Sequence, residues 1–281
     1  MFLVFGSTGQ VASELSKITS EAVFLSRADA DLSNPEACAA AIRAHAPRAV
    51  INAAAYTAVD RAEEDEALAT AINGHAPAAM ARACTALGIP LVHISTDYVF
   101  DGSGDQPFAP DHPTAPLGAY GRSKLLGEVG VRGAGGVHAI LRTSWVFSAH
   151  GSNFVKTMLR LGRERESLRV VADQIGGPTS ARAIARACLT MAEGLRDQPE
   201  LSGTYHFAGS PATSWAGFAR AIMARAGLDC TIEDIPSAAY PTPAQRPLNS
   251  RLECAALAAF GLSAPDWYSD LGIILKELSA Q

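Results

Sequence analysis

The chain has 281 residues, which is too long for one small module and predicts about two lobes. Its composition, 48% hydrophobic and 18% charged, excludes an intrinsically disordered protein. A net charge of −5 provides no basic surface for gripping a phosphate backbone, so nucleic acid is not expected as a partner.

The N-terminal residues have none of the features of a secretory signal. Residues 1–5 run directly into Gly6 without a basic segment, and no later apolar run approaches the roughly 18 residues that a membrane span needs. The five cysteines lack CxxC spacing, and no histidine stands at zinc-ligand spacing from them. We therefore expect a cytoplasmic protein with reduced cysteines, no membrane association and no metal site.

Short apolar runs alternate with helical segments through the first half of the chain. The expected strands are residues 2–5, 22–25, 49–52, 91–95 and 138–142. The expected helices are residues 11–19, 34–46, 61–87 and 120–131. Such alternation is typical of βαβ units, so residues 1–145 predict an α/β fold with a doubly wound parallel sheet of the Rossmann type that binds a dinucleotide.

After Trp145 the pattern becomes less regular. We expect helices over 153–165 and 180–195 and strands over 168–171 and 204–207. Four prolines between residues 236 and 248 predict a stiff, irregular surface loop. Residues 146–281 are thus expected to form mainly a smaller C-terminal substrate-binding lobe, with elements around 166–197 returning to the first domain.

A glycine-rich turn follows the first expected strand. Residues 6–12 read GSTGQVA, which matches GxxGxx(G/A) between a strand and a helix. Gly6 permits the sharp exit from the strand, Gly9 lets the backbone approach a pyrophosphate, and the helix N-terminus offers free N–H groups to the anion. The turn predicts a dinucleotide site, with an ordinary turn and helix cap as the alternative.

The end of the second expected strand bears on the choice of cofactor. Where NAD-binding chains often have an acid for the ribose 2′-hydroxyl, this chain has Ser26 and Arg27. A hydroxyl and a guanidinium suit a 2′-phosphate, which favours NADPH over NADH unless Arg27 is only a solvated surface residue. The expected cofactor contacts are Gly6, Gly9, Gln10, Val11, Ser26, Arg27, Asp31, Leu32, Ala53, Ala54, Ala55, Tyr56, Thr57, Tyr120 and Lys124.

A YxxxK motif opens the helix that is expected after residue 119. Tyr120 and Lys124 lie one helical turn apart, so both side chains share a face and the ammonium can lower the pKa of the phenol. Thr96 ends the fourth expected strand at the sheet edge where ligands of open α/β folds bind. We therefore expect Tyr120, Lys124 and Thr96 to be catalytic.

In this order, the glycine turn, the strand-end hydroxyl and the YxxxK motif resemble the extended branch of the short-chain dehydrogenase/reductase superfamily. Over almost the whole chain the resemblance narrows to the dTDP-4-dehydrorhamnose reductase family. The segments that carry it are residues 5–11, 52–60, 95–100, 142–146, 153–158, 173–179 and 240–247. The late segments are the most discriminating, because a generic reductase has no reason to share a substrate lobe.

The resemblance implies an oxidoreductase of nucleotide-sugar metabolism. Its reaction would be the NAD(P)H-dependent reduction of the C4 ketone of dTDP-4-dehydrorhamnose to dTDP-L-rhamnose, the last step in making that precursor of lipopolysaccharide and other glycans. It implies that Tyr120 donates the proton, that Lys124 supports it and binds cofactor, and that Thr96 adjusts the pKa of the tyrosine. The implied substrate contacts are Thr96, Asp97, Trp145 and Arg246, the last of these at the diphosphate.

Two departures and two alternatives accompany this resemblance. The acid that some members use for the adenosine ribose is replaced by Ser26 or Arg27, and a histidine common after the triple alanine is Tyr56. Some relatives form a homodimer around Mg²⁺, but no local ligand spacing assigns such a site here. The alternatives are another extended-branch enzyme, an epimerase or dehydratase, and a non-catalytic regulatory subunit of the methionine adenosyltransferase type.

Overall fold

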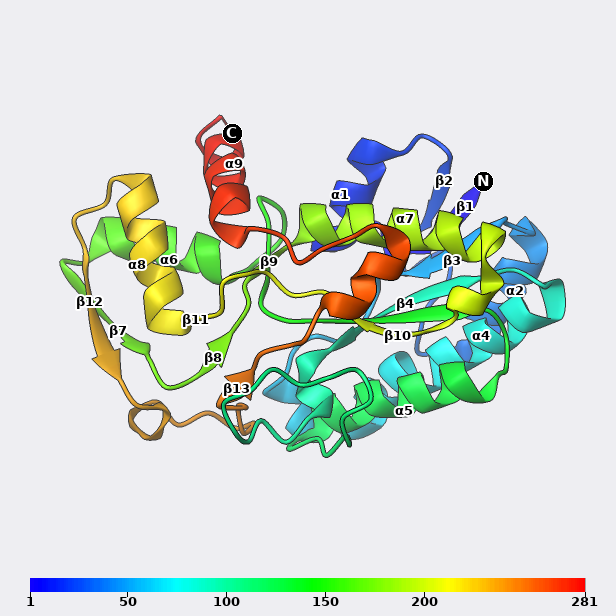
Figure 1. Cartoon of the computed structure of the whole chain (residues 1–281), viewed down its shortest axis with the longest axis horizontal. Helices are drawn as coiled ribbons and strands as arrows, with labels where there is room; N and C mark the ends of the chain where they lie inside the picture. The colour runs from blue at the N-terminus through cyan, green and yellow to red at the C-terminus, as the bar shows by residue number, and fades with distance from the viewer. Residues whose placement is uncertain (281) are drawn as a thin grey trace.

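A parallel sheet organises residues 1–280, the part of the chain that the computed structural model describes. Its strand order is β10–β5–β4–β3–β1–β2, and all neighbouring strands are parallel (Figure 1). The strands are β1 (Phe2–Phe5), β2 (Ala22–Leu25), β3 (Ala49–Asn52), β4 (Leu91–Thr96), β5 (His138–Thr143) and β10 (Gly203–His206). The chain leaves β1 for β2 on one side and returns to β3 on the other, so the switch point of the sheet lies between β1 and β3.

Helices cover both faces of this sheet. On one face α1 (Gln10–Ile18) and α7 (Ala181–Asp197) pack with Phe2 and Val4 of β1. On the other face Leu3 and Phe5 pack with α2 (Pro35–His45) and α4 (Ala76–Leu87), and α5 (Ala119–Gly133) lies beside α4. Because both faces are covered, β1 and β3 are buried at every position, which explains why they are apolar apart from Asn52 at the end of β3. The expected doubly wound α/β fold is confirmed.

The expected single helix over residues 61–87 is wrong. The segment is divided into η1 (Arg61–Glu63), α3 (Glu66–Thr70), a π turn η2 (Ala71–His75) and α4. Pro77 has no N–H to offer the Asn73 carbonyl four residues earlier, and its ring would collide with that carbonyl in a regular helix. The wider π turn avoids the collision, and the Asn73 carbonyl lies against α5, where a Cβ on Gly127 would be 2.1 Å from it.

The second half of the chain adds smaller sheets and a separate core. The paired strands are β7 (Ser167–Val171) with β12 (Thr231–Ile235), β6 (Val146–Phe147) with β9 (Thr179–Ser180), and β8 (Ile175–Gly176) with β11 (Thr213–Ser214) and β13 (Asn249–Ser250). The further helices are η3 (Asp97–Val99), α6 (Phe154–Glu164), η4 (Pro199–Leu201), α8 (Trp215–Ala226), η5 (Ser237–Ala239), η6 (Ala255–Phe260) and α9 (Trp267–Ser279). α6, α8, β7 and β12 form a lobe at the left of Figure 1.

Several elements of this lobe differ from expectation. α8 and α9 were not predicted, although both contribute to the core around Phe218 and Leu271. The strand over residues 168–171 was predicted, but it pairs with β12 in the C-terminal lobe and not with the large sheet. All five cysteines are free thiols. Within residues 1–280, none of the helices combines the length and the hydropathy that a bilayer crossing requires.

Candidate active site

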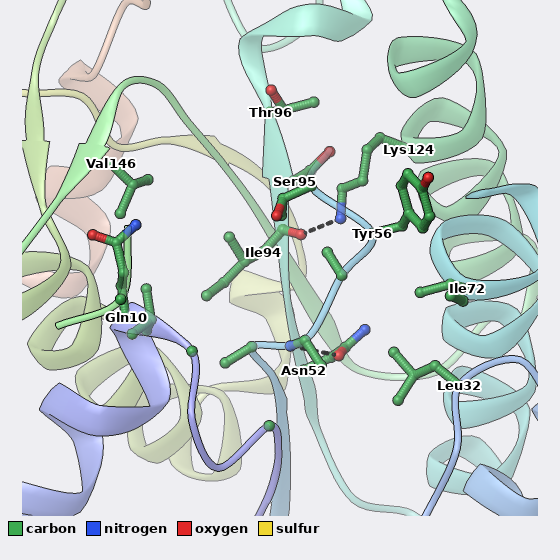
Figure 2. Close-up of a pocket in the computed structure, with 18 of the residues that line it drawn as sticks. Gln10, Leu32, Asn52, Tyr56, Ile72, Ile94, Ser95, Thr96, Lys124 and Val146 are labelled. Atoms are coloured by element: carbon green, nitrogen blue, oxygen red, sulfur yellow. Dashed lines mark hydrogen bonds between the residues drawn. The ribbon is translucent and has the colours of Figure 1, made fainter. Parts of the chain in front are cut away.

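A cavity of about 770 Å³ opens at the carboxyl ends of β1, β3, β4 and β5, the edge at which doubly wound sheets bind ligands. Its lining joins the glycine turn to the YxxxK motif (Figure 2). The expected site residues found in it are Gly6, Gly9, Gln10, Val11, Ser26, Arg27, Asp31, Leu32, Ala53, Ala54, Ala55, Tyr56, Thr57, Thr96, Asp97, Tyr120, Lys124 and Trp145. Arg246 is outside this lining.

The glycine turn forms a cradle at one end of the cavity. Gly6 has a φ of +108°, which an L side chain rarely adopts, and a Cβ there would be 3.5 Å from the Ala53 carbonyl. Gly9 is the N-cap of α1 and has no side chain to accept a hydrogen bond. The first N–H groups of the helix therefore lack a side-chain cap at the edge of the cavity. Exposed donors beside a glycine floor fit a pyrophosphate, and the residues present therefore suit a dinucleotide.

The groups expected at the adenosine end are partly engaged with one another. Arg27 Nε donates to Asp31 Oδ2 at 3.2 Å, and the Arg27 side chain is 79% exposed. Ser26 Oγ donates to Asp29 Oδ2 at 2.6 Å, an interaction that the sequence analysis did not anticipate. The guanidinium is therefore free to turn toward a phosphate, whereas the Ser26 hydroxyl is held by its neighbour.

Tyr120 is the second residue of α5, and this half-buried residue lines the cavity. The ring packs edge-on against Tyr98, with centroids 5.4 Å apart. Burial raises the pKa of Tyr120 above its ordinary value of 10.0, and the Thr96 side chain opposes this shift. Thr96 also donates to Asp97 Oδ1 at 3.0 Å. A phenol with a raised pKa is protonated at neutral pH, but it is a weaker acid than an ordinary tyrosine.

Lys124 lies buried one turn further along α5. Its Nζ donates to the Ile94 carbonyl at 2.6 Å, as Figure 2 shows. Burial lowers the pKa of Lys124 to about 8, against the opposing charge of Glu128. The side chains that shift the pKa of Tyr120 besides burial are Thr96, Asp97 and Tyr98. The expected lowering of this pKa by the Lys124 ammonium is therefore not found in this structure.

Two residues that the sequence analysis missed lie beneath this lysine. His93 Nε2 is 3.5 Å from Lys124 Nζ, and His93 Nδ1 is 3.1 Å from the side-chain nitrogen of Asn52. Burial lowers the pKa of His93 well below its ordinary value, and the Lys124 charge lowers it further. His93 is therefore neutral at physiological pH and adds no second charge below Lys124.

Two polar atoms at the cavity wall have no hydrogen-bond partner among the residues described. They are Asp97 Oδ2 and Thr143 Oγ1, both buried. Thr143 on β5 pairs in register with Thr96 on β4, so the two hydroxyl-bearing residues are neighbours at the sheet edge. Burial raises the pKa of Asp97 to about 6, and hydrogen bonding from the Ser250 and Thr96 side chains opposes this shift. Unpaired buried polar atoms are rare, and at a cavity wall they suit a ligand that supplies the missing partners.

Arg246 lies at the edge of the site rather than in its wall. Its guanidinium donates to Asp60 Oδ2 at 2.6 Å, and the Ala244 N–H donates to Asp60 Oδ1 at 3.2 Å. Asp60 thereby ties the proline-rich loop of residues 236–248 to the segment that follows β3. Arg246 is expected near a diphosphate, and in the structure it lies in this ion pair.

A buried ion pair supports the floor of the site. Arg142 donates to Glu128 at 2.7 and 2.9 Å, and Ser95 Oγ donates to the same carboxylate at 2.6 Å. Burial alone would raise the pKa of Glu128, but these donors hold it below its usual value. The pair ties α5 to β4 and β5, the three elements that carry Tyr120, Thr96 and Thr143.

Outside the cavity, Glu14, His150 and Glu277 bring three ligand-type atoms within 4.8 Å of one another. They come from α1, the segment after β6 and α9, so no local spacing in the sequence could reveal them. The Lys17 ammonium contacts both carboxylates and supplies a positive charge at the same place.

Known proteins resemble this chain over nearly its whole length. The RmlD substrate binding domain family matches residues 1–280. The dTDP-4-dehydrorhamnose reductase of Burkholderia thailandensis is 45% identical, with 99% of each chain covered. A crystal structure of a dTDP-4-dehydrorhamnose reductase from Clostridium acetobutylicum matches with a TM-score of 0.92 and 35% identity over 99% of each chain. The enzyme of that name from Bacillus anthracis, in complex with NADP, matches with a TM-score of 0.91 and 33% identity over 98% of each chain.

Proposed function

The chain belongs to the RmlD substrate binding domain family, and we propose that it reduces the C4 ketone of dTDP-4-dehydrorhamnose to dTDP-L-rhamnose with NADPH. The observation that carries the proposal is one cavity that unites the glycine cradle with Thr96, Tyr120 and Lys124. These groups are what a ketone reduction needs, because a dinucleotide and a proton donor must meet at the same carbonyl.

The cofactor end follows from the charges around the cradle. Free N–H groups at the start of α1 would receive the pyrophosphate, and the exposed Arg27 guanidinium would contact the 2′-phosphate. NADPH, when bound, supplies the hydride. Residues 53–57 line the next part of the cavity, and Asn73 fixes them by accepting from the Tyr56 N–H at 2.8 Å and donating to the Tyr56 carbonyl at 3.0 Å.

At the reacting centre Tyr120 would give its proton to the ketone oxygen, and with the hydride that bound NADPH would supply to C4 the carbonyl would become a secondary alcohol. Thr96 would stabilise the phenolate that remains by turning its single hydroxyl proton from Asp97 Oδ1 to the Tyr120 oxygen. Lys124, anchored by the Ile94 carbonyl, orients the ribose next to the nicotinamide and places positive charge near the phenolate. Solvent then returns the proton to Tyr120.

The substrate end follows from the unpaired groups. Asp97 Oδ2 accepts a hydrogen bond from a sugar hydroxyl, and Trp145 forms an apolar wall for the sugar ring. Arg246 meets the diphosphate by exchanging its ion pair with Asp60 for one with the substrate. The proline-rich loop would thereby respond to the presence of the nucleotide.

The test is NADPH oxidation by the purified protein with dTDP-4-dehydrorhamnose, followed by NMR identification of dTDP-L-rhamnose. We expect Tyr120→Phe to lose most turnover and to bind NADPH as the wild type does. Tyr205→Phe is the matched control, because Tyr205 lies outside the cavity lining and its hydroxyl donates to the Leu201 carbonyl. An epimerase or dehydratase would consume substrate without net NADPH oxidation, and a regulatory subunit would bind NADPH without any turnover.

A further inference from the structure

Trp145 has a backbone conformation that bulky residues rarely adopt. Its φ is +50°, and within residues 1–280 Ala46 is the other non-glycine residue with a positive φ. The Ala46 conformation is ordinary, because Ala46 caps the C-terminus of α2. Trp145 does not cap a helix. It lies in the connection between β5, which pairs with β4, and β6, which pairs with β9. Its surroundings must therefore hold it in this conformation.

Two neighbours hold the indole. The Trp215 ring stacks on it with centroids 3.7 Å apart and an interplanar angle of 11°. Gly176 meets it at a different point, where a Cβ would be 2.8 Å from Trp145 Cε2. The Trp145 carbonyl also accepts from the Thr179 N–H at 3.2 Å. Trp145 is thereby fixed by contacts from β8, β9 and α8.

The position of Trp215 is set by the C-terminal lobe. Trp215 is the first residue of α8, whose N-cap Ser214 accepts from the Gly217 N–H at 2.9 Å. Its ring also contacts Phe154 at 4.6 Å between centroids, and β11 beside it pairs with β8. Trp215 does not itself line the cavity. It can therefore affect a ligand only through Trp145.

We infer that Trp215 is a positioning residue for the sugar end of the site, where it keeps the strained Trp145 indole in the cavity wall. This rests on the proposed function, which puts the sugar between Asp97 and Trp145. Trp145, the member of the stack that lines the cavity, would contact the C–H bonds of a deoxysugar with its apolar indole. Without Trp215 the Trp145 backbone can relax from its left-handed conformation, and the wall moves away from the sugar.

Trp215→Leu tests this inference, with Trp267→Phe as the matched control. Trp267 belongs to the same lobe core, but its ring packs edge-on against Phe218 and does not stack on Trp145. We expect Trp215→Leu to lose the exciton-coupled near-ultraviolet circular dichroism of the stacked indoles. We also expect its KM for dTDP-4-dehydrorhamnose and its Kd for dTDP-L-rhamnose to rise about tenfold, which is on the scale of one aromatic contact plus backbone strain. The kcat and the Kd values for NADPH and dTDP should stay within about twofold of the wild type, as should all values for Trp267→Phe.

Several outcomes would overturn the inference. One is loss of the coupled signal in Trp215→Leu with unchanged affinity for dTDP-L-rhamnose, and another is equal weakening of dTDP and dTDP-L-rhamnose. If Trp215→Leu does not fold, Gly176→Ala presses on Trp145 from its other contact and must weaken dTDP-L-rhamnose selectively. A wild type that binds the product normally but does not turn over counts against the proposed function alone. A wild type that does not bind the product overturns both.

Discussion

The buried charge of Asp97 predicts that one substitution in the site stabilises the protein. Burial raises the pKa of this carboxyl from 3.8 to about 6, and its Oδ2 has no partner among the described residues. A raised acid pKa means that the folded state binds the proton more tightly than the unfolded state. The ionised form therefore costs stability above about pH 6, and the cost disappears as the pH falls toward 3.8. At about 1.4 kcal/mol per pH unit, the difference amounts to about 3 kcal/mol.

Asp97→Asn removes this charge with little change in shape. We expect urea unfolding to show a gain of about 3 kcal/mol at pH 8 and of less than about 1 kcal/mol at pH 4, together with a raised KM for the sugar nucleotide. Asp105→Asn is the control, because that carboxylate lies exposed on a loop. No gain at pH 8, or an equal gain at both pH values, would refute the claim that the site holds a desolvated carboxylate.

Three further predictions concern the buried lysine, the scaffold and the cofactor end. Because the pKa of Lys124 is lowered to about 8, wild-type kcat/KM should fall as the pH rises through about 8, and Lys124→Arg should move this decline to higher pH; a decline at the same pH in both proteins would argue against Lys124. Glu128→Gln leaves the buried Arg142 without its carboxylate and should cost about 3–5 kcal/mol in urea unfolding, so a loss below about 1 kcal/mol would be inconsistent with the buried pair. Arg27→Ala should lower kcat/KM for NADPH about tenfold and leave that for NADH unchanged, whereas equal effects on both cofactors would exclude a 2′-phosphate contact.

The sequence predicted those parts of the molecule that depend on neighbouring residues. Strands β1, β2 and β3 occur at the expected bounds, because each is a short, mainly apolar run. β1 and β3 are buried at every position, whereas β2 at the edge of the sheet is only partly buried. The glycine turn and the YxxxK motif were found for the same reason, since a strand, a turn and one helical turn bring their residues together locally. The cavity contains both motifs as expected.

Long-range contacts were beyond the sequence analysis. Trp215 meets Trp145 from 70 positions along the chain, and Asp60 pairs with Arg246 across 186 positions. The sequence predicts His93 only as part of the strand over residues 91–95, whereas its ring nitrogens contact Lys124 and Asn52 in the structure. In each case the partner is set by the packing of separate elements, which periodicity along one segment cannot specify.

Pro77 is a local sequence feature that indicates an interrupted helix. Pro77 stands inside the expected helix of residues 61–87 and removes a helical hydrogen bond. It predicts an interruption near Asn73, where the structure has its π turn. The interrupted segment contacts the site, because the Asn73 side chain accepts from the Tyr56 N–H at the cavity wall and donates to Ser123 on α5.

The most direct measurement of the central claim is a paired assay of the wild type and Tyr120→Phe with dTDP-4-dehydrorhamnose and NADPH. The account predicts that the wild type consumes one NADPH for each dTDP-L-rhamnose formed, and that Tyr120→Phe loses most of this turnover while its Kd for NADPH is unchanged. Retained turnover in Tyr120→Phe would contradict its role as proton donor. A wild type that binds NADPH but forms no dTDP-L-rhamnose would contradict the proposed reaction itself.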